Sequence, residues 1–289
     1  MQRNWQKYRI MTTYRSLLRQ SCLNANTLIS SDLYRDTRIL ICESCNISNE
    51  FLLANLDEDF PTKNLELFYQ LLQRRKRGEP ISKIIGRRVF WKHIFEITID
   101  VLDPRPESEF LVTEVISNAN RNGGKILDLG TGSGCLAISL ALELKNCLIT
   151  ASDVSLEALK IAKLNSVKLG AEVSFVHSDW FKAIDEVFDT IVCNPPYIDR
   201  RDRLSLDLEV RNFDPEIALF PDIDAVNCYR LISKNLSRHL KHGGNAFFEV
   251  GKSQSRIVAK IFEEAGFKTI SFSNDFSGGE RVVCVKKDA

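Results

Sequence analysis

The stretch Lys125-Ile126-Leu127-Asp128-Leu129-Gly130-Thr131-Gly132-Ser133-Gly134 decides the fold of this 289-residue chain. Its apolar first half is typical of a buried strand, its three glycines predict a tight turn, and the apolar run from Cys135 to Leu142 predicts a helix. Glycine lets the backbone take positive φ and lets a ligand approach without meeting a Cβ. The free N–H groups that open the following helix favour a carboxylate or a phosphate. We therefore expect a cofactor to bind at residues 130–134.

A second apolar stretch, Leu148 to Ser152, predicts a neighbouring strand that ends in Asp153. The glycines at every second position differ from the dinucleotide fingerprint G-x-G-x-x-G, so the turn alone is a weak signal. Asp153 strengthens it, because an acidic residue about 20 positions on accepts hydrogen bonds from a ribose diol in nucleotide-binding α/β folds. Alternatively, Asp153 or Ser155 caps the helix predicted from Leu156 to Leu169, which Gly170 closes.

A third strand, predicted from Val173 to His177, leads into Ser178-Asp179-Trp180-Phe181. Asp179 offers a carboxylate that accepts from the amino group of an adenine, and Trp180 or Phe181 offers an aromatic face for the ring. These residues extend the expected nucleotide site beyond the glycine turn.

A fourth apolar strand, Thr190 to Cys193, ends at Asn194-Pro195-Pro196-Tyr197. Two consecutive prolines end a strand and leave a stiff backbone whose carbonyls project outward. The Asn194 side chain offers one acceptor oxygen and two donor hydrogens, and Pro195 adds a carbonyl acceptor without a competing N–H. With Tyr197 as a flat apolar face, the four residues are suited to hold a planar –NH2 group. A plain proline-terminated loop is the alternative for the tetrapeptide taken alone.

From residue 126 onward the pattern predicts seven strands, near 126–129, 148–152, 173–177, 190–193, 245–250, 268–272 and 281–285. Helices are predicted between most of them, which indicates an α/β protein with a predominantly parallel sheet wound on both faces. Ligands of such sheets bind beyond the carboxyl ends of the strands. Because the glycine turn, Asp153, Asp179 and Asn194 each follow a strand, we expect them to converge on one rim.

The N-terminal part of the chain reads as helices with little strand signal, near 13–20, 31–45, 49–55 and 62–77. Four basic residues at 74–77 fall in the final turn of the last helix, where they complement the helix dipole. Between Ile84 and Val101 the pattern predicts a β-hairpin. The expected organisation is therefore a helical domain over 1–83, a β-hairpin linker over 84–104 and an α/β domain over 105–289.

Charge and cysteine usage narrow the function classes. With 39 basic and 38 acidic residues the net charge is +1, which gives no global sign of a nucleic-acid-binding surface. Eight scattered cysteines with a single C-x-x-C, Cys42 and Cys45, predict buried thiols in a reducing compartment and no metal site.

No apolar stretch approaches the roughly 20 residues needed to cross a bilayer. Residues 1–10 lack the apolar segment of a signal peptide. We expect a cytoplasmic protein, with Met11 as an alternative start to Met1.

Taken together, these motifs resemble the class I methyltransferases that use S-adenosylmethionine, and more narrowly the glutamine N5-methyltransferases that modify peptide chain release factors. The resemblance covers nearly the whole chain and includes Arg75 to Ile81, Gly86 with Phe90-Trp91, Pro104 to Glu109, Phe248 to Gly251 and Gly279 to Val282. It implies a Rossmann-like seven-stranded methyltransferase domain, preceded by a small helical domain and a β-hairpin connector. The cofactor-binding residues that it implies are Asp128, Gly130, Thr131, Gly132, Ser133, Gly134, Asp153, Asp179, Trp180 and Asn194.

The resemblance also implies a reaction, methyl transfer to the glutamine of the GGQ motif in class 1 peptide chain release factors. Asn194, Pro195, Pro196 and Tyr197 would receive the glutamine side chain, and the N-terminal helices would grip the protein substrate. We expect a monomer without a stable nucleic-acid or membrane partner. One departure from the family is the turn from Phe220 to Ala225, which lacks the usual glycines. We expect it to affect a peripheral loop and not the cofactor site.

The chemistry of the tetrapeptide Asn194-Pro195-Pro196-Tyr197 is also compatible with two other functions. An exocyclic amine of a DNA or RNA base is also a planar, conjugated –NH2, so a nucleic-acid N-methyltransferase would need the same grip. The charge balance and the N-terminal half count against it. A translation-associated binding module without turnover is the third possibility. The intact Asp128, Asp153 and Asn194-Pro195-Pro196-Tyr197 count against that one.

Overall fold

The computed structural model describes residues 12–23, 33–119, 123–275 and 277–288. The chain divides into two compact units, Met1–Ile85 and Gly86–Ala289. The second unit includes the hairpin that the sequence predicts as a connector. The two alternative starts, Met1 and Met11, and the expected helix start at Ser31 lie outside the described residues.

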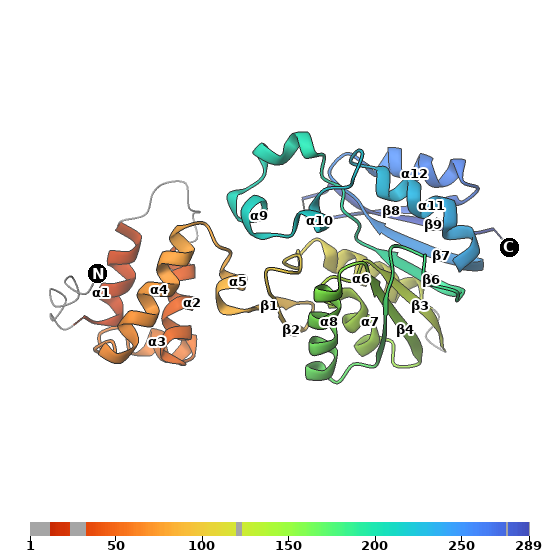
Figure 1. Ribbon diagram of the computed structural model, residues 1–289. Helices are drawn as coiled ribbons and strands as arrows, with labels where there is room; N and C mark the ends of the chain where they lie inside the picture. Colours follow the sequence, from red (N-terminus) through yellow and green to blue (C-terminus); the bar gives the residue numbers. More distant parts are fainter. Residues whose placement is uncertain (1–11, 24–32, 120–122, 276, 289) are drawn as a thin grey trace. The chain divides into compact units, whose positions relative to one another are not determined.

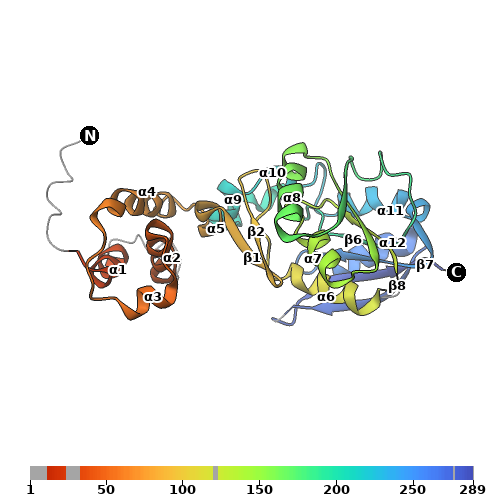
Figure 2. The same cartoon turned by 90° about the horizontal axis from the view of Figure 1, so that it is seen from below.

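Short helices form the first unit: α1 (Tyr14–Leu23), α2 (Leu33–Cys45), α3 (Asn49–Ala54), the 3₁₀ turn η2 (Thr62–Asn64), α4 (Leu65–Lys76) and α5 (Ile81–Ile85). Figure 2 shows α1 to α4, in red to orange, gathered as a small bundle. Their apolar faces share a hydrophobic core that includes Leu17, Leu40 and Phe68, all buried. The Ser48 side chain caps α3 by accepting from the Phe51 N–H at 3.1 Å. The unit is thus helical, as the sequence predicts.

The basic residues at the end of α4 lie in its last turn, as predicted, and two of them also form ion pairs. Arg75 is only 2% exposed, and its Nε donates to Asp36 on α2 at 2.7 Å. Arg74 donates to both carboxylate oxygens of Glu79, at 2.8 and 2.5 Å. Two of the four clustered basic residues therefore connect α4 to α2 and to the segment that leads into α5.

The second unit opens with a β-hairpin of β1 (Arg87–Phe90) and β2 (His93–Glu96), which pair antiparallel. Phe90 and Phe95 are buried, and their rings meet edge to face with centroids 6.1 Å apart. Both belong to the same hydrophobic cluster as Leu111 of the first helix after the hairpin. The hairpin is thus packed into the core of the second unit.

Seven strands form one sheet in the order β5-β4-β3-β6-β7-β9-β8. They are β3 (Gly124–Leu129), β4 (Cys147–Asp153), β5 (Val173–His177), β6 (Phe188–Cys193), β7 (Leu240–Glu249), β8 (Lys268–Asn274) and β9 (Glu280–Lys286). The β3, β4, β5, β6 and β7 pairings are parallel, whereas β9 runs antiparallel to both β7 and β8. All seven predicted strands are present, and the sheet is predominantly parallel as predicted.

Helices cover both faces of this sheet (Figure 1). One face packs against α6 (Ser108–Asn118), α7 (Cys135–Glu143) and α8 (Leu156–Leu169), and the other against α11 (Asn227–His239) and α12 (Ser255–Glu264). Between β6 and α11 the chain makes three short turns of helix: η3 (Arg200–Ser205), α9 (Leu208–Phe213) and α10 (Glu216–Leu219). The two hydrophobic clusters that result are the layers of a doubly wound α/β fold.

Within the described ranges, no helix has the length and apolar character that a membrane crossing requires. The cysteines with described side chains are free thiols, and Cys193, Cys228 and Cys284 among them are buried. No group of three histidine, cysteine or acidic side chains suited to a metal ion occurs in the part of the chain that the structure describes.

Candidate active site

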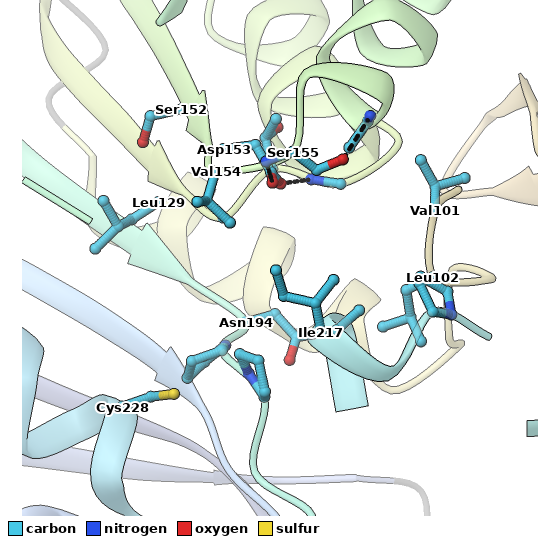
Figure 3. A pocket seen from close by; sticks show the side chains of 18 of the residues that line it. Val101, Leu102, Leu129, Ser152, Asp153, Val154, Ser155, Asn194, Ile217 and Cys228 are labelled. Atoms are coloured by element: carbon cyan, nitrogen blue, oxygen red, sulfur yellow. Dashed lines mark hydrogen bonds between the residues drawn. The ribbon is translucent and has the colours of Figure 1, made fainter. Parts of the chain in front are cut away.

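A cavity of about 340 Å³ lies at the carboxyl ends of β3, β4, β5 and β6. Figure 3 shows part of its lining, with Asp153 and Ser155 on one side and Asn194 on the other. Of the residues that the sequence singles out, the lining includes Gly130, Thr131, Gly132, Ser133, Asp153, Asp179, Trp180, Asn194, Pro195 and Pro196. Asp128, Gly134 and Tyr197 do not line it. The four strand ends thus converge on one cavity of the size that small-molecule sites have.

The glycine turn presents bare backbone to this cavity. Gly130 and Gly132 have φ of +81° and +57°, and a Cβ built on either would meet no atom within 4 Å. At Gly134, with φ of +83°, a Cβ would come within 2.9 Å of Ile138 and 3.1 Å of Ala162. The first two glycines therefore leave open space toward the cavity, while the third allows α7 to pack against α8.

Asp128 supports the glycine turn from beneath. It is fully buried, and its Oδ2 accepts from the Thr131 hydroxyl at 2.6 Å and from the Ala137 N–H at 3.1 Å. Its Oδ1 has no hydrogen-bond partner among the described residues. Burial raises the pKa of the Asp128 carboxyl to about 7, against the opposing effect of these two bonds. Asp128 thus acts on the turn and on the start of α7, without reaching the cavity.

Asp153 binds the backbone of the glycine turn and of the segment that begins α8, and it is not itself the cap of α8. Its Oδ2 accepts from the Gly132 N–H at 2.8 Å, and its Oδ1 accepts from the Ser155 N–H at 2.8 Å. The cap of α8 is Ser155, whose hydroxyl accepts from the Ala158 N–H, and Gly170 closes that helix with φ of +64°. Burial raises the pKa of Asp153. Each carboxylate oxygen has a second lone pair, so Asp153 is still able to accept from a diol in the cavity.

The segment after β5 is held by Ser178. Its hydroxyl donates to the Trp180 carbonyl at 2.7 Å and accepts from the Ala183 N–H at 2.9 Å. This turn puts Trp180 at φ of +50°, an unusual value for a bulky residue. Asp179 pairs with Lys182 at 2.6 Å near the surface. The strained turn thus places Trp180 and Asp179 in the lining of the cavity.

The tetrapeptide after β6 is anchored at both ends. Asn194 donates from Nδ2 to the Ser108 hydroxyl at 3.1 Å. The Tyr197 hydroxyl donates to Oε1 of Glu249 at 3.2 Å, and its carbonyl accepts from Gln254 at 2.9 Å. Tyr197 is therefore turned toward the end of β7. Pro195 and Pro196, which lie between the two anchors, line the cavity together with Asn194.

The lining also includes residues that the sequence motifs did not assign to the site, although Arg105 among them belongs to a motif of the resemblance, Pro104 to Glu109. Leu102 and Arg105 come from the segment before α6, and Ile217 and Phe220 come from the segment before α11 (Figure 3 labels Leu102 and Ile217). The expectation that the turn from Phe220 to Ala225 is peripheral to the site is wrong, because Phe220, Pro221 and Asp222 line the cavity. Residues far apart in the chain meet in this lining, which a local pattern does not reveal.

Comparisons with known proteins bear on the fold and the family of this chain. Residues 22–86 match the family model of the PrmC N-terminal domain, and residues 100–209 match that of the methyltransferase small domain. A methyltransferase from Pyrococcus furiosus has a similar fold, with a TM-score of 0.51 at 16% identity, over 68% of this chain and 89% of that one. At this identity the likeness shows the fold alone.

Two kinds of curated relatives match the chain. A bifunctional methyltransferase from Rickettsia prowazekii is 38% identical over 86% of this chain, and the chain spans about half of that relative, 52%. A release factor glutamine methyltransferase from Cereibacter sphaeroides is 36% identical over 88% of this chain and 91% of its own length. With a helical first unit, a class I methyltransferase sheet and relatives of this similarity, the chain belongs to the family of release factor glutamine methyltransferases.

Proposed function

We propose that this protein transfers a methyl group from S-adenosylmethionine to the side-chain amide nitrogen N5 of a glutamine, in the GGQ motif of class 1 peptide chain release factors. The observation that carries the proposal is the convergence of the glycine turn and Asn194-Pro195-Pro196 on one cavity. The family supports the choice of cofactor and substrate.

The cavity fits the cofactor at its glycine end. The open space in front of Gly130 and Gly132 leaves room for a group that contacts backbone. In the proposal, Asp153 accepts from the ribose diol, and Asp179 and Trp180 contact the adenine; all three residues line the cavity, which supports these roles. When bound, S-adenosylmethionine supplies a methyl group activated by its sulfonium.

The chain's own part in the transfer is to orient the acceptor nitrogen. A glutamine amide nitrogen is a poor nucleophile because its lone pair is delocalised into the carbonyl. In the proposed mechanism, Oδ1 of Asn194 and the carbonyl of Pro195 accept the two amide hydrogens. This arrangement holds the nitrogen toward the methyl group and favours the positive charge that develops on it. The proton that is finally lost goes to solvent in this scheme.

Substitution of Asn194 by alanine tests the role of this residue. Because Asn194→Ala removes one of two fixed acceptors, the transfer rate should fall roughly 100-fold or more. The dissociation constant of S-adenosylmethionine, measured by calorimetry, should change little. Equal loss of transfer and of cofactor affinity would count against the proposed role of Asn194.

A labelling experiment tests the substrate. Cofactor carrying a radioactive methyl group is offered with a class 1 release factor, duplex DNA and ribosomal RNA in separate reactions. We expect label on the release factor, and a GGQ to GGA release factor should take none. Label on nucleic acid alone would support the base-methylating alternative, and label on none would support a binding module.

The setting of this activity is also a proposal. We infer a cytoplasmic monomer, because the family modifies release factors and the net charge of +1 gives no sign of a nucleic-acid or membrane surface. The first unit would hold the protein substrate.

A further inference from the structure

Glu249 is a buried carboxylate behind the tetrapeptide. It is the last residue of β7 and is 1% exposed. Its Oε2 accepts from the Ser108 hydroxyl at 2.6 Å, and its Oε1 accepts from the Tyr197 hydroxyl at 3.2 Å. Its backbone carbonyl accepts from the Tyr229 hydroxyl at 2.7 Å. One buried side chain is therefore connected to both polar ends of Asn194-Pro195-Pro196-Tyr197.

The connection to Asn194 has a fixed polarity. An ionised carboxylate only accepts hydrogen bonds, so Ser108 commits its single proton to Glu249. The Ser108 oxygen is then left as an acceptor, and the Asn194 Nδ2 meets it at 3.1 Å. Because the amide group is planar, its oxygen points away from Ser108. The direction of the bond from Asn194 thus follows from the bond that Ser108 donates to Glu249.

We propose that Glu249, acting through Ser108, is a positioning residue that keeps the carbonyl oxygen of Asn194 turned toward the methyl acceptor. The inference rests on the function proposed above, in which this oxygen accepts a hydrogen of the substrate amide. If the Asn194 amide were reversed, its own NH2 would face the substrate NH2, donor against donor. The bond from Tyr197 to the second oxygen of Glu249 holds the other end of the tetrapeptide in register.

The surroundings of Glu249 bear on its charge. Burial raises the pKa of Glu249 above its ordinary value, although the bonds from Ser108 and Tyr197 and the positive charge of Arg281 oppose this rise. Arg281, on β9, is itself held by Asp275 at 2.9 Å. The groups that order the tetrapeptide are thus the same groups that favour the ionised carboxylate.

Glu249→Gln tests the polarity with almost no change in size. In the orientation that keeps the Tyr197 hydroxyl as donor to the glutamine oxygen, the glutamine NH2 faces Ser108 and donates to it, which frees the Ser108 proton for Oδ1 of Asn194 and reverses the amide. We expect kcat for release factor methylation to fall roughly 10- to 100-fold, with KM and the cofactor dissociation constant within about twofold of wild type. Ser108→Ala interrupts the same connection without altering Glu249, and should show the same division between kcat and KM.

Tyr229→Phe is the matched control. It removes a buried hydrogen bond to the same residue, but to the backbone carbonyl of Glu249 and not to its side chain. It should leave kcat within about twofold of wild type. A fall in kcat equal to that of Glu249→Gln would overturn the proposal in favour of a general structural role for the end of β7.

Two further measurements make the test specific to Asn194. If Glu249 acts through Asn194, adding Glu249→Gln to Asn194→Ala should lower kcat by less than about a further twofold. Full additivity of the two effects on kcat would contradict the proposal. The side-chain amide of Asn194 is also followed by NMR, assigned by its absence from the Asn194→Ala spectrum. Protection of one Nδ2 proton should be lost in Glu249→Gln and in Ser108→Ala, and kept in Tyr229→Phe.

The NMR measurement needs no substrate and therefore separates the two proposals. If wild-type protein labels no release factor, the proposed function fails. The protection of the Asn194 amide in the variants still shows whether Glu249 orients Asn194 through Ser108. If release factor is labelled but the Asn194 amide is unprotected in wild type, or protected alike in all variants, the role of Glu249 fails alone.

Discussion

At the scale of single residues, Asp128 is an acid whose environment sets its protonation. Burial raises its pKa from 3.8 to about 7. The folded protein therefore holds a proton between about pH 4 and pH 7 that the unfolded chain releases. The contribution of this proton to the free energy of unfolding is complete below about pH 4 and is lost as the pH rises through about 7.

Asp128→Asn removes this titration. The free energy of unfolding of the variant, relative to wild type, should therefore rise by roughly 3 kcal/mol between pH 5 and pH 8. Urea denaturation of cofactor-free protein measures it. The control is Asp189→Asn. Burial raises the pKa of Asp189, but the bonds from the Lys125 N–H and from Lys241 outweigh this effect, so its pKa lies below the ordinary value. Its difference from wild type should stay constant over the same range. Parallel curves for wild type and Asp128→Asn would show that Asp128 is already ionised at pH 5.

The glycines of the turn allow a second comparison at this scale. Gly130→Ala and Gly134→Ala both place a Cβ at positive φ, which costs about 1–2 kcal/mol. Only at Gly134 does the Cβ also meet Ile138 and Ala162, so overpacking adds roughly 1–3 kcal/mol. Thermal unfolding should show the larger loss for Gly134→Ala. Calorimetry should show that Gly130→Ala weakens cofactor binding more than its smaller loss of stability explains. Equal stabilities for the two variants would mean that α7 and α8 adjust to the methyl group.

At the scale of elements, one ion pair connects the two segments that close the cavity. Arg105, before α6, donates to Asp214, after α9, at 2.6 Å, and the Asp214 side chain is 1% exposed. The Asp214 carboxylate also accepts from the Asp103 N–H at 3.3 Å. Both segments contribute lining residues, among them Leu102 and Ile217. The pair therefore holds one wall of the cavity against the other.

Arg105→Met removes one positively charged partner of the buried Asp214 carboxylate, whereas adding Asp214→Asn removes the carboxylate charge as well. Arg105→Met should destabilise the protein by about 3 kcal/mol and raise the dissociation constant of the cofactor. Adding Asp214→Asn should restore part of the stability, because an amide oxygen is still able to accept from the Asp103 N–H. Urea denaturation of both single variants and the double variant measures the coupling. If the double variant is as unstable as the sum of the single ones, the pair does not act as a unit.

The elements also show what the sequence was able to predict. Strands and their loops follow from local periodicity, so the meeting of Gly130, Asp153 and Asn194 at one rim was predictable. Contacts between side chains far apart in the chain were not. Ser108 and Glu249 are 141 positions apart, and Arg105 and Asp214 are 109 apart. The four-residue helix α10 is too short for a periodic signal, so its place in the cavity wall was missed.

At the scale of the whole molecule, the two units have separate hydrophobic cores. All residues that line the cavity fall between Asp100 and Leu231, within the second unit. The first unit matches a family model of its own. Under the proposed function, this division assigns cofactor binding to the second unit and binding of the protein substrate to the first.

Deleting residues 1–85 tests this division of tasks on the basis of the proposed function. The remaining Gly86–Ala289 keeps every cavity residue, so its dissociation constant for S-adenosylmethionine should stay within about twofold of the full chain. Its kcat/KM for an intact release factor should fall about 100-fold, which corresponds to about 2.7 kcal/mol of lost substrate binding. The matched substrate is a short GGQ peptide, which has little surface for the first unit to hold. The deletion should lower kcat/KM for this peptide much less than for the release factor. Equal losses for peptide and release factor would place the substrate grip in the second unit. Loss of cofactor binding would show instead that the second unit needs the first in order to fold.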